Sequence, residues 1–394
     1  MKYDVTQYGA VPNGELCTKQ IQKAIDECFC AGGGEVVIPE GTFLTGGLRL
    51  RSGVTLHLLE NAILLGSINP EDYIDYINDE IEPIPEEERS AAADNVMPEM
   101  KSSSSAIPYS RWNNAIIRAI HAKNVAIIGE RGSEINGQNC FDEKGEENYR
   151  GPHAVNMWYC ENINLSGYTI RDSANWAHAI QNSRGISVCG VTVLGGHDGF
   201  DVRTCDDISI KGCRFLTGDD GIAGFDNVNV SVSDCYFESA CSIFRFGATN
   251  MIVDNCIGVA PTTYGYRGSL SDEEKKNRVK AAKNSRRSCL GVFFYYCDYR
   301  ANIRSTPGNI VIRNSSFKNP DAMLTLPFGH KWCCNRSLDN ITFENCTVIG
   351  RDGYDDINLI EGKNVAAIEL YNLTLKNLYS PKIVCDENTV ISQY

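Results

Sequence analysis

Apolar and polar residues alternate along most of the chain, in segments that share one template. Seven segments follow it, and they begin at Asn162, Gly185, Asp207, Asn229, Asn250, Asn309 and Asn340. Alternation with a period of two is typical of a strand with one buried face. The first five starts are 23, 22, 22 and 21 residues apart, so each unit is a short set of strands and turns. A unit of this size cannot bury its own apolar face, and stacking of successive units supplies the core.

The repeat predicts an all-β fold, a right-handed, single-stranded parallel β-helix with about 22 residues per coil. The units lack a helical stripe between strands, and they also lack the recurrent Leu of leucine-rich repeats. Residues 18–30 instead carry apolar residues at helical spacing, with Thr18 as the expected N-cap. We expect this short helix to cap the open end of the stack, because an exposed strand edge invites aggregation.

We expect one domain over residues 1–394, because a solenoid grows by adding coils to the same core. Two stretches interrupt the pattern and predict loop insertions. Residues 70–111 are rich in acidic residues, Pro and Ser, and residues 261–308 form the second interruption. Either insertion is long enough to reach over a cleft.

The net charge limits the kinds of partner that the chain is expected to bind. The formal net charge is −13, whereas a chain that binds nucleic acid is expected to carry a basic footprint. One stretch departs from this balance, because Ser271 and Glu274 predict a capping box and residues 275–287 hold seven Lys or Arg. This run is either a solvated helix or a cationic wall beside an anionic substrate.

No segment reaches the ~18 apolar residues of a membrane span. The N-terminus has no basic or apolar leader region, so we expect a cytoplasmic location.

The seventeen cysteines are an odd number, and many lie inside the strand template. Those at its seventh place are Cys213, Cys235, Cys256 and Cys346. A thiol at this place acts as a small apolar group that faces inward. Two close pairs are Cys28 with Cys30 and Cys333 with Cys334. Neither has the second Cys or His pair that zinc requires, so we expect reduced packing thiols, no metal and no other cofactor.

Three aspartates fall one repeat apart in the segment GGHDGFDVRTCDDISIKGCRFLTGDDGIAGFD. Asp198 precedes Asp219 by 21 residues and Asp220 by 22. Stacked strands lie about 4.8 Å apart, so the three side chains are expected to be lateral neighbours. Asp219 and Asp220 are adjacent in sequence, and a turn or bulge is therefore needed for both to reach one cleft. The glycines that flank them allow such a turn.

Clustered carboxylates restrict one another's ionisation. At least one of the three is expected to have a raised pKa, and their titrations are expected to be coupled. A protonated acid beside ionised carboxylates is what the hydrolysis of a glycosidic bond requires. The spacing leaves two alternatives open, which are calcium binding by the carboxylates and the capping of turns.

Aromatic and polar residues fall in register with this cluster. Trp176 and His178 precede Asp198 by one coil, His197 adjoins it, and Arg245 follows the paired aspartates by one coil. A sugar-binding groove needs an aromatic face for the ring, and His or Arg donors for hydroxyl and carboxylate groups. The shared register makes these residues candidates for substrate binding.

Several longer motifs point to one known family. They are YGAVPNG, IQKAIDEC, GGGEVVIPEGTFLTGGLRLRSGVTLHLLENAILLGS and RGPHAVNMWYCENINLSGYTIRDSANWAHAIQ. Together with GHDGFD and TGDDGIA, they resemble glycoside hydrolase family 28, the polygalacturonase family of β-helix enzymes, and especially its bacterial exo-acting branch. The resemblance implies an inverting hydrolase. By it, Asp219 is the general acid, and Asp198 and Asp220 position and deprotonate water.

The chain departs from the family pattern at three places. His197 follows Gly196 where the family has Asn-Thr, and Cys241 or Ser242 stands where the family has the His of a Gly-His-Gly segment. The nearest match to the family's Arg-Ile-Lys segment is residues 266–269, which retain the Arg as Arg267 and lack the Lys. In the family, that His and Lys help to bind galacturonate, so their loss weakens the expectation of homogalacturonan as the substrate.

These observations define a set of site residues and an expected function. The catalytic candidates are Asp198, Asp219 and Asp220, and the substrate-binding candidates are Trp176, His178, His197, Asp201, Arg245 and Arg267. We expect a glycoside hydrolase that removes a terminal sugar from an imported oligosaccharide of the pectin type. The alternatives are a polysaccharide lyase or epimerase with a Lys or Arg base and often calcium, and a carbohydrate-binding protein without activity. The sequence leaves the oligomeric state open.

Overall fold

The structure is a computed structural model that describes residues 1–74, 78–83, 108–280, 285–297, 303–326, 336–351, 357–362, 365–378 and 380–394. The chain divides into two compact units. The first consists of Met1–Arg184, Gly190–His197 and Leu270–Ala282, and the second of Gly185–Cys189, Asp198–Ser269 and Lys283–Tyr394. The single domain expected from the repeat stays a prediction.

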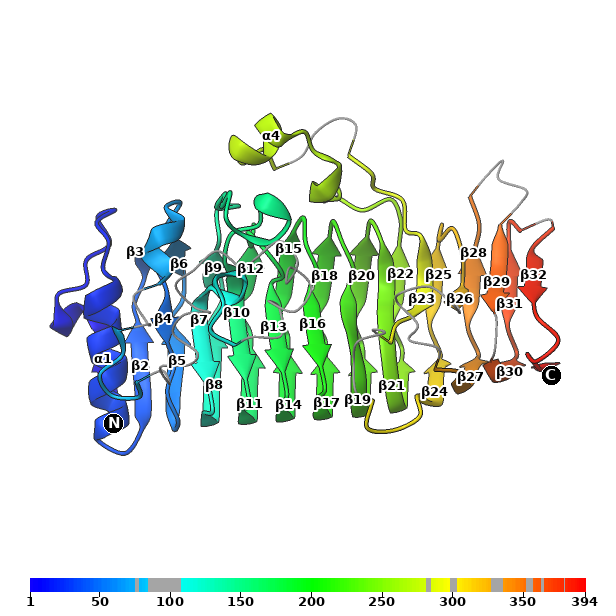
Figure 1. Cartoon of the computed structure of the whole chain (residues 1–394), viewed down its shortest axis with the longest axis horizontal. Helices are drawn as coiled ribbons and strands as arrows, with labels where there is room; N and C mark the ends of the chain where they lie inside the picture. Colours follow the sequence, from blue (N-terminus) through cyan, green and yellow to red (C-terminus); the bar gives the residue numbers. More distant parts are fainter. Residues whose placement is uncertain are drawn as a thin grey trace. The chain divides into compact units, whose positions relative to one another are not determined.

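The strands of the first unit form three parallel ladders (Figure 1). One joins β1 (Lys2–Asp4), β2 (Gly34–Ile38), β5 (Val54–Leu58), β8 (Lys123–Gly129) and β11 (Glu161–Ser166). The second joins β4 (Leu48–Arg49), β7 (Ala115–Ile120), β10 (His153–Trp158) and β13 (His178–Gln181). The third joins β3 (Gly41–Thr45), β6 (Ala62–Gly66), β9 (Glu134–Asn136), β12 (Thr169–Arg171) and β15 (Thr192–Gly195). Each circuit of the chain adds one strand to every ladder, which is the coil that the repeat predicts.

The second unit repeats this arrangement. Its first ladder joins β16 (Phe200–Arg203), β19 (Ile222–Ser233), β21 (Ser242–Asp254), β23 (Gly291–Tyr295), β26 (Leu324–Leu326), β29 (Asn358–Gly362) and β32 (Lys382–Cys385). The second joins β14 (Arg184–Cys189), β17 (Asp206–Lys211), the later parts of β19 and β21, β24 (Gly308–Arg313), β27 (Leu338–Glu344), β30 (Val365–Tyr371) and β33 (Ile391–Gln393). The third joins β18 (Arg214–Thr217), β20 (Tyr236–Ser239), β22 (Ile257–Val259), β25 (Ser316–Lys318), β28 (Thr347–Ile349) and β31 (Thr374–Lys376). The expected all-β fold of stacked parallel coils is confirmed.

The Asn, Asp or Gly that opens the template has a conformational reason. Six of the seven starts have a positive φ, for example 57° at Asp207, 58° at Asn229 and 61° at Asn250. Gly, Asn and Asp tolerate this left-handed region better than other residues do. The side chains also bond from coil to coil, because Asn229 Nδ2 donates to Asp207 Oδ1 at 2.9 Å and Asn250 Nδ2 to Asn229 Oδ1 at 3.3 Å.

The core is filled by the inward positions of the template. In the second unit, the rings of Phe215 and Phe237 stack with centroids 5.1 Å apart. The predicted packing thiols Cys213, Cys235, Cys256 and Cys346 are all buried. All fifteen cysteines of the described residues are free thiols. Cys333 and Cys334 lie outside the described residues.

Helix α1 (Thr18–Cys30) forms over the predicted range and packs its buried face, including Ile21, Ile25 and Cys28, on the N-terminal coil of the first unit. The expected cap is wrong, because Cys17 is the N-cap and Thr18 is the first helical residue. The Thr18 hydroxyl instead accepts a hydrogen bond from the Gly46 N–H at 2.7 Å. It therefore ties the start of the helix to the bend that follows β3.

The two predicted insertions are described in part. Residues 75–77 and 84–107 of the first, and 281–284 and 298–302 of the second, lie outside the described residues. In the second insertion, the capping box of Ser271 and Glu274 is confirmed and begins helix α4 (Asp272–Lys276). Strand β23 lies inside the range expected to be a loop, so that insertion is interrupted by a coil. Among the described residues, no helix combines the length and apolarity needed to span a membrane.

Candidate active site

Register places Asp198 and Asp220 side by side in the second unit. Strand β16 pairs with β19 so that Phe200 lies opposite Ile222, two residues after each aspartate. The Asp220 N–H donates to Asp198 Oδ1 at 3.1 Å. The predicted lateral contact between these residues is therefore present.

The turn between β18 and β19 brings Asp219 to the same place. Its carbonyl oxygen accepts hydrogen bonds from the Thr217 hydroxyl at 3.0 Å and the Ser239 hydroxyl at 2.7 Å. These bonds fix the peptide between the two aspartates outside the strand pattern, so that successive side chains need not alternate in direction. One carboxylate oxygen each of Asp219 and Asp220, with the Cys241 sulfur, lie within 4.8 Å of one another.

The glycines after Asp198 and Asp220 make this stacking possible. A Cβ at Gly199 would lie 2.5 Å from the Gly221 carbonyl oxygen, and one at Gly221 would lie 2.8 Å from the Ile243 carbonyl oxygen. Both distances are too short for any side chain. Glycine is therefore required where the coils approach beside the carboxylates.

Arg245 organises two of the three carboxylates. Its Nε forms an ion pair with Asp220 Oδ2, and its Nη2 lies 3.8 Å from Asp198 Oδ2. The guanidinium carbon lies 4.4 Å from the centroid of the Tyr296 ring, which holds it as a cation–π partner. Asp220 Oδ1 also accepts the Ser242 N–H at 2.8 Å. Asp220 is thus held by a cation and a backbone donor.

Asp198 has a different environment. Its side chain is only 1% exposed, and its Oδ2 accepts no hydrogen bond from the described residues. Burial, followed by the charges of Asp219 and Asp220, raises the pKa of Asp198 well above its ordinary value, although Arg245 opposes the shift. This is the raised pKa that the clustering predicts.

Asp201 is placed beside this cluster but is already paired. Its side chain is fully buried, and its two carboxylate oxygens lie 2.6 Å and 2.9 Å from Arg203 Nε and Nη2. The predicted contact of Asp201 with substrate stays a prediction. Arg203 was not predicted, although residues two apart in a strand face the same side, and this spacing could have indicated the pair.

Three other candidates lie in the first unit. His178 is 0% exposed, and its Nε2 lies 2.9 Å from the Tyr168 hydroxyl. Trp176 is 6% exposed and its ring lies 5.2 Å from the His153 ring. His197 is 2% exposed, with its ring stacked 6.0 Å from Tyr149. Each is packed against a neighbouring ring in this structure, and their predicted roles in substrate binding stay predictions.

The basic run contributes to both units. In the first, Lys275 Nζ lies 4.5 Å from the centre of the Tyr149 ring and Lys280 Nζ lies 2.5 Å from Asp172 Oδ2. In the second, Arg286 contacts the Cys241 sulfur and was missed as an individual site residue. Arg267 is buried in the short 3-10 helix η7 (Arg267–Ser269).

A metal would find a poor set of ligands at this site. Asp219, Asp220 and Cys241 are the one group of described residues with ligand atoms close enough to hold an ion. Calcium takes six to eight oxygen ligands, whereas one of these three atoms is sulfur. A cation bound there would also face the guanidinium of Arg286. The residues present therefore do not fit a calcium site.

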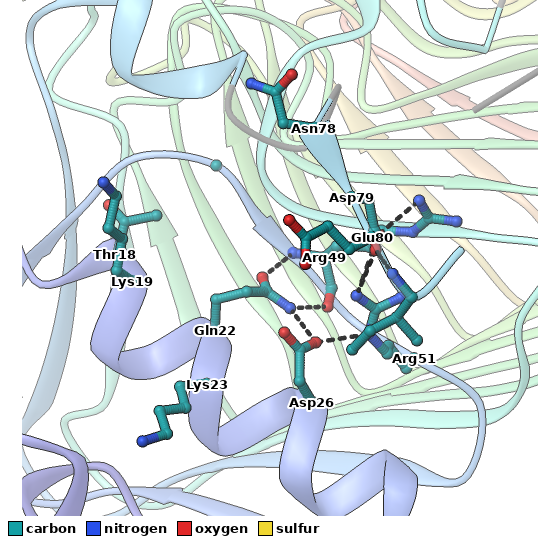
Figure 2. A pocket seen from close by; sticks show the side chains of 12 residues that line it. Thr18, Lys19, Gln22, Lys23, Asp26, Arg49, Arg51, Asn78, Asp79 and Glu80 are labelled. Carbon is teal, nitrogen blue, oxygen red and sulfur yellow. Dashed lines mark hydrogen bonds and ion pairs between the residues drawn. The ribbon is translucent and has the colours of Figure 1, made fainter. Parts of the chain in front are cut away.

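A separate pocket of about 590 Å³ lies in the first unit, between α1 and residues 78–81 (Figure 2). Its two buried cations are Arg49 and Arg51, and both pair with Asp79 in the part of the chain that the structure describes. Arg51 also pairs with Asp26 of α1 at 2.6 Å. The acidic residues of the pocket thus neutralise its two buried arginines, and we assign the pocket no substrate.

Part of the chain matches the model of a known protein family. Residues 96–255 match the model of glycosyl hydrolases family 28. The matched segment, less than half of the chain, contains Asp198, Asp219, Asp220 and Arg245. The resemblance that the motifs indicate is therefore found independently over the segment that holds the carboxylates.

Individual relatives agree with this match. A probable polygalacturonase of Vitis vinifera is 27% identical over 245 residues, 58% of this chain and 45% of the relative. The exo-poly-alpha-D-galacturonosidase of Dickeya chrysanthemi is 51% identical over 73 residues, 18% of this chain and 12% of the relative. The chain thus spans less than half the length of each.

The fold has a close structural counterpart. The hyperthermoactive exopolygalacturonase of Thermotoga maritima aligns over 100% of this chain and 90% of its own, with a TM-score of 0.68 and 16% identity. At this identity the likeness concerns the fold. It confirms the right-handed parallel β-helix expected from the repeat.

Proposed function

We propose that the chain is a glycoside hydrolase that cleaves galacturonic-acid-containing oligosaccharides from one end, with inversion at the anomeric carbon. The observation that carries this proposal is the meeting of Asp198, Asp219 and Asp220 in one cluster with three different environments. Hydrolysis needs carboxyl groups that differ in protonation. The family match and the names of the relatives support the reaction class and the sugar.

The environments suggest a division of labour. Asp219 is the most exposed of the three and is the proposed proton donor to the leaving oxygen, as the resemblance implies. Asp220, paired with Arg245, is the proposed base that activates water. Asp198 is buried with a raised pKa, so we propose that it retains a proton at rest and limits repulsion within the cluster. This differs from the role that the resemblance implies for Asp198.

The central test is Asp219→Asn. The amide has the shape of the carboxyl group but cannot donate the proton, so turnover should fall by about 10²–10⁴-fold while the far-UV spectrum is unchanged. Asp234→Asn is the matched control, because Asp234 lies exposed with a positive φ that Asn also tolerates. Near-normal turnover in Asp219→Asn would contradict the mechanism.

Substrate, stereochemistry and mode of action need a product analysis. Oligosaccharides with α-linked galacturonate, with rhamnogalacturonan linkages and with neutral sugars should be compared, and NMR should read the first anomer formed. An inverted anomer and release of single terminal sugars are expected. A retained anomer contradicts inversion, and a broad mixture of product lengths contradicts exo-action. An unsaturated, ultraviolet-absorbing product that disappears with a chelator would instead identify a lyase.

A further inference from the structure

Arg286 is anchored beside the carboxylate cluster by its own neighbours in the second unit. Its carbonyl oxygen accepts the Tyr266 N–H at 3.0 Å, and its Nε donates to the Ala240 carbonyl oxygen at 3.0 Å. The guanidinium carbon lies 4.6 Å from the centroid of the Tyr266 ring. The side chain is therefore held in place before any ligand arrives.

The guanidinium reaches the candidate catalytic residues through Cys241. Arg286 Nη2 contacts the Cys241 sulfur, and that sulfur lies within 4.8 Å of carboxylate oxygens of Asp219 and Asp220. Burial, with the charges of Asp219 and Asp220, raises the pKa of Cys241, so its thiol is neutral. A neutral thiol leaves the charge of Arg286 uncompensated at this contact.

Three other arginines of the second unit are already engaged. Arg203 pairs with Asp201, and Arg245 pairs with Asp220. Arg287 uses its Nη1 to donate to the carbonyl oxygens of Thr262 and Thr263. Arg286, by contrast, forms no ion pair with a carboxylate within the described residues, and its Nη1 donates to no acceptor there. The residue is half-buried.

We infer that Arg286 binds the carboxylate of the uronic acid at the cleavage point, and so selects acidic over neutral sugars. This inference rests on the proposed hydrolytic function and names the residue that would give it its substrate class. A planar guanidinium matches a carboxylate with two parallel N–H donors, and desolvation beside Cys241 strengthens such a pair. The residue comes from the basic run of the second insertion and contacts Cys241, which with Ser242 is one of the two residues at the place of the His in the family that the motifs resemble.

A second reading is that Arg286 only offsets the negative charge of the aspartates. The two readings differ in what Arg286→Gln does to selectivity. Trigalacturonate and the same trimer with its carboxyl groups reduced should be assayed in parallel with the wild type, Arg286→Gln and Arg287→Gln. If Arg286 binds the uronate, the ratio of kcat/KM for the acidic to the reduced trimer should fall by about 10–100-fold in Arg286→Gln. It should stay within about twofold in Arg287→Gln, the adjacent arginine whose partners are carbonyl groups. An equal loss on both trimers, or equal ratios in all three proteins, overturns the inference.

Binding separates this inference from the proposed function. Trigalacturonate should be titrated by calorimetry into Asp219→Asn and into the double variant with Arg286→Gln. Weaker binding in the double variant supports the uronate site, even if the wild type cleaves neither trimer, in which case only the hydrolytic proposal fails. Equal binding in both variants overturns the site and leaves the hydrolytic proposal to the turnover test.

Discussion

The three aspartates have the same side chain and occupy different environments. Asp220 is held by Arg245 and a backbone N–H, Asp198 is buried with one oxygen that accepts no hydrogen bond among the described residues, and Asp219 is the most exposed. Neighbours and burial, more than residue type, decide which carboxyl group donates a proton and which accepts one. The consequence can be measured on stability as well as on turnover.

Asp198→Asn should stabilise the folded protein, and more so at neutral than at acidic pH. The folded pKa of Asp198 is raised above the unfolded value near 3.9, so its ionisation opposes folding. Below about pH 3.9 Asp198 is protonated in both the folded and the unfolded state, so it does not change the free energy of unfolding. Above that pH the wild-type protein loses stability, and the loss grows as the pH rises toward the folded pKa. The Asn oxygen can still accept the Asp220 N–H. We expect a gain in the free energy of unfolding on the order of 1–3 kcal/mol at pH 7, measured by urea unfolding. A gain of equal size at pH 3.5 would contradict a folded-state pKa of Asp198 that lies above its unfolded value.

At the scale of single elements, the acidic segment at residues 78–83 is joined to the N-terminal coil by charge. Arg51 has a side chain that is 2% exposed, and it pairs with Asp26 of α1 at 2.6 Å and with Asp79 at 2.9 Å (Figure 2). It also pairs with Glu82 at 2.7 Å. Asp79 is itself only 5% exposed. Burial would raise the pKa of Asp79, but the hydrogen bond from Arg51 and the other donors lower it.

Arg51→Met should therefore destabilise the fold. Removing one partner of a buried ion pair leaves the other charge unpaired, which costs about 3–5 kcal/mol. The loss should be largest above about pH 4 and shrink below it, because protonation of Asp79 removes the same interaction in the wild type. Chemical unfolding across pH would measure it. Arg131→Met is the control, since Arg131 is 89% exposed beside Glu60 and its loss should cost less than about 1 kcal/mol. Equal costs in the two variants would mean that the buried pair does not anchor the segment.

The elements also show what periodicity can predict. The seventh-place thiols face the core as expected, because an alternating strand with one buried face has only two choices for each side chain. His178 shows the limit. Strand β13 is buried at all four positions, so its register predicted a position along the stack but not whether the ring would face solvent.

At the scale of the whole molecule, the accessibility of the thiols tests whether the coils stack with these side chains in the core. Among the described cysteines, Cys30 and Cys189 are exposed, whereas those at the seventh place of the template are buried. Burial raises the pKa of Cys346, which lowers its thiolate fraction further. Native-state alkylation read by mass spectrometry should therefore label Cys30 and Cys189, and label the seventh-place thiols only after unfolding. Rapid labelling of Cys235 or Cys346 in the folded protein would contradict the inward stack.

The sequence alone determined the coil, its turns and the register of the three aspartates. These features repeat locally, and a period near 22 residues together with the spacing of parallel strands converts sequence distance into lateral contact. Only the tertiary structure decided which cations serve the carboxylates. Arg245 lies one coil after Asp220, and the direction of its side chain depends on packing against Tyr296. Arg286 belongs to an insertion without a repeat and contacts Cys241, which lies 45 residues earlier in the chain. A segment without a repeat has no register that could be read from the sequence. Its side chains are positioned instead by the contacts that the segment makes after the coils have stacked.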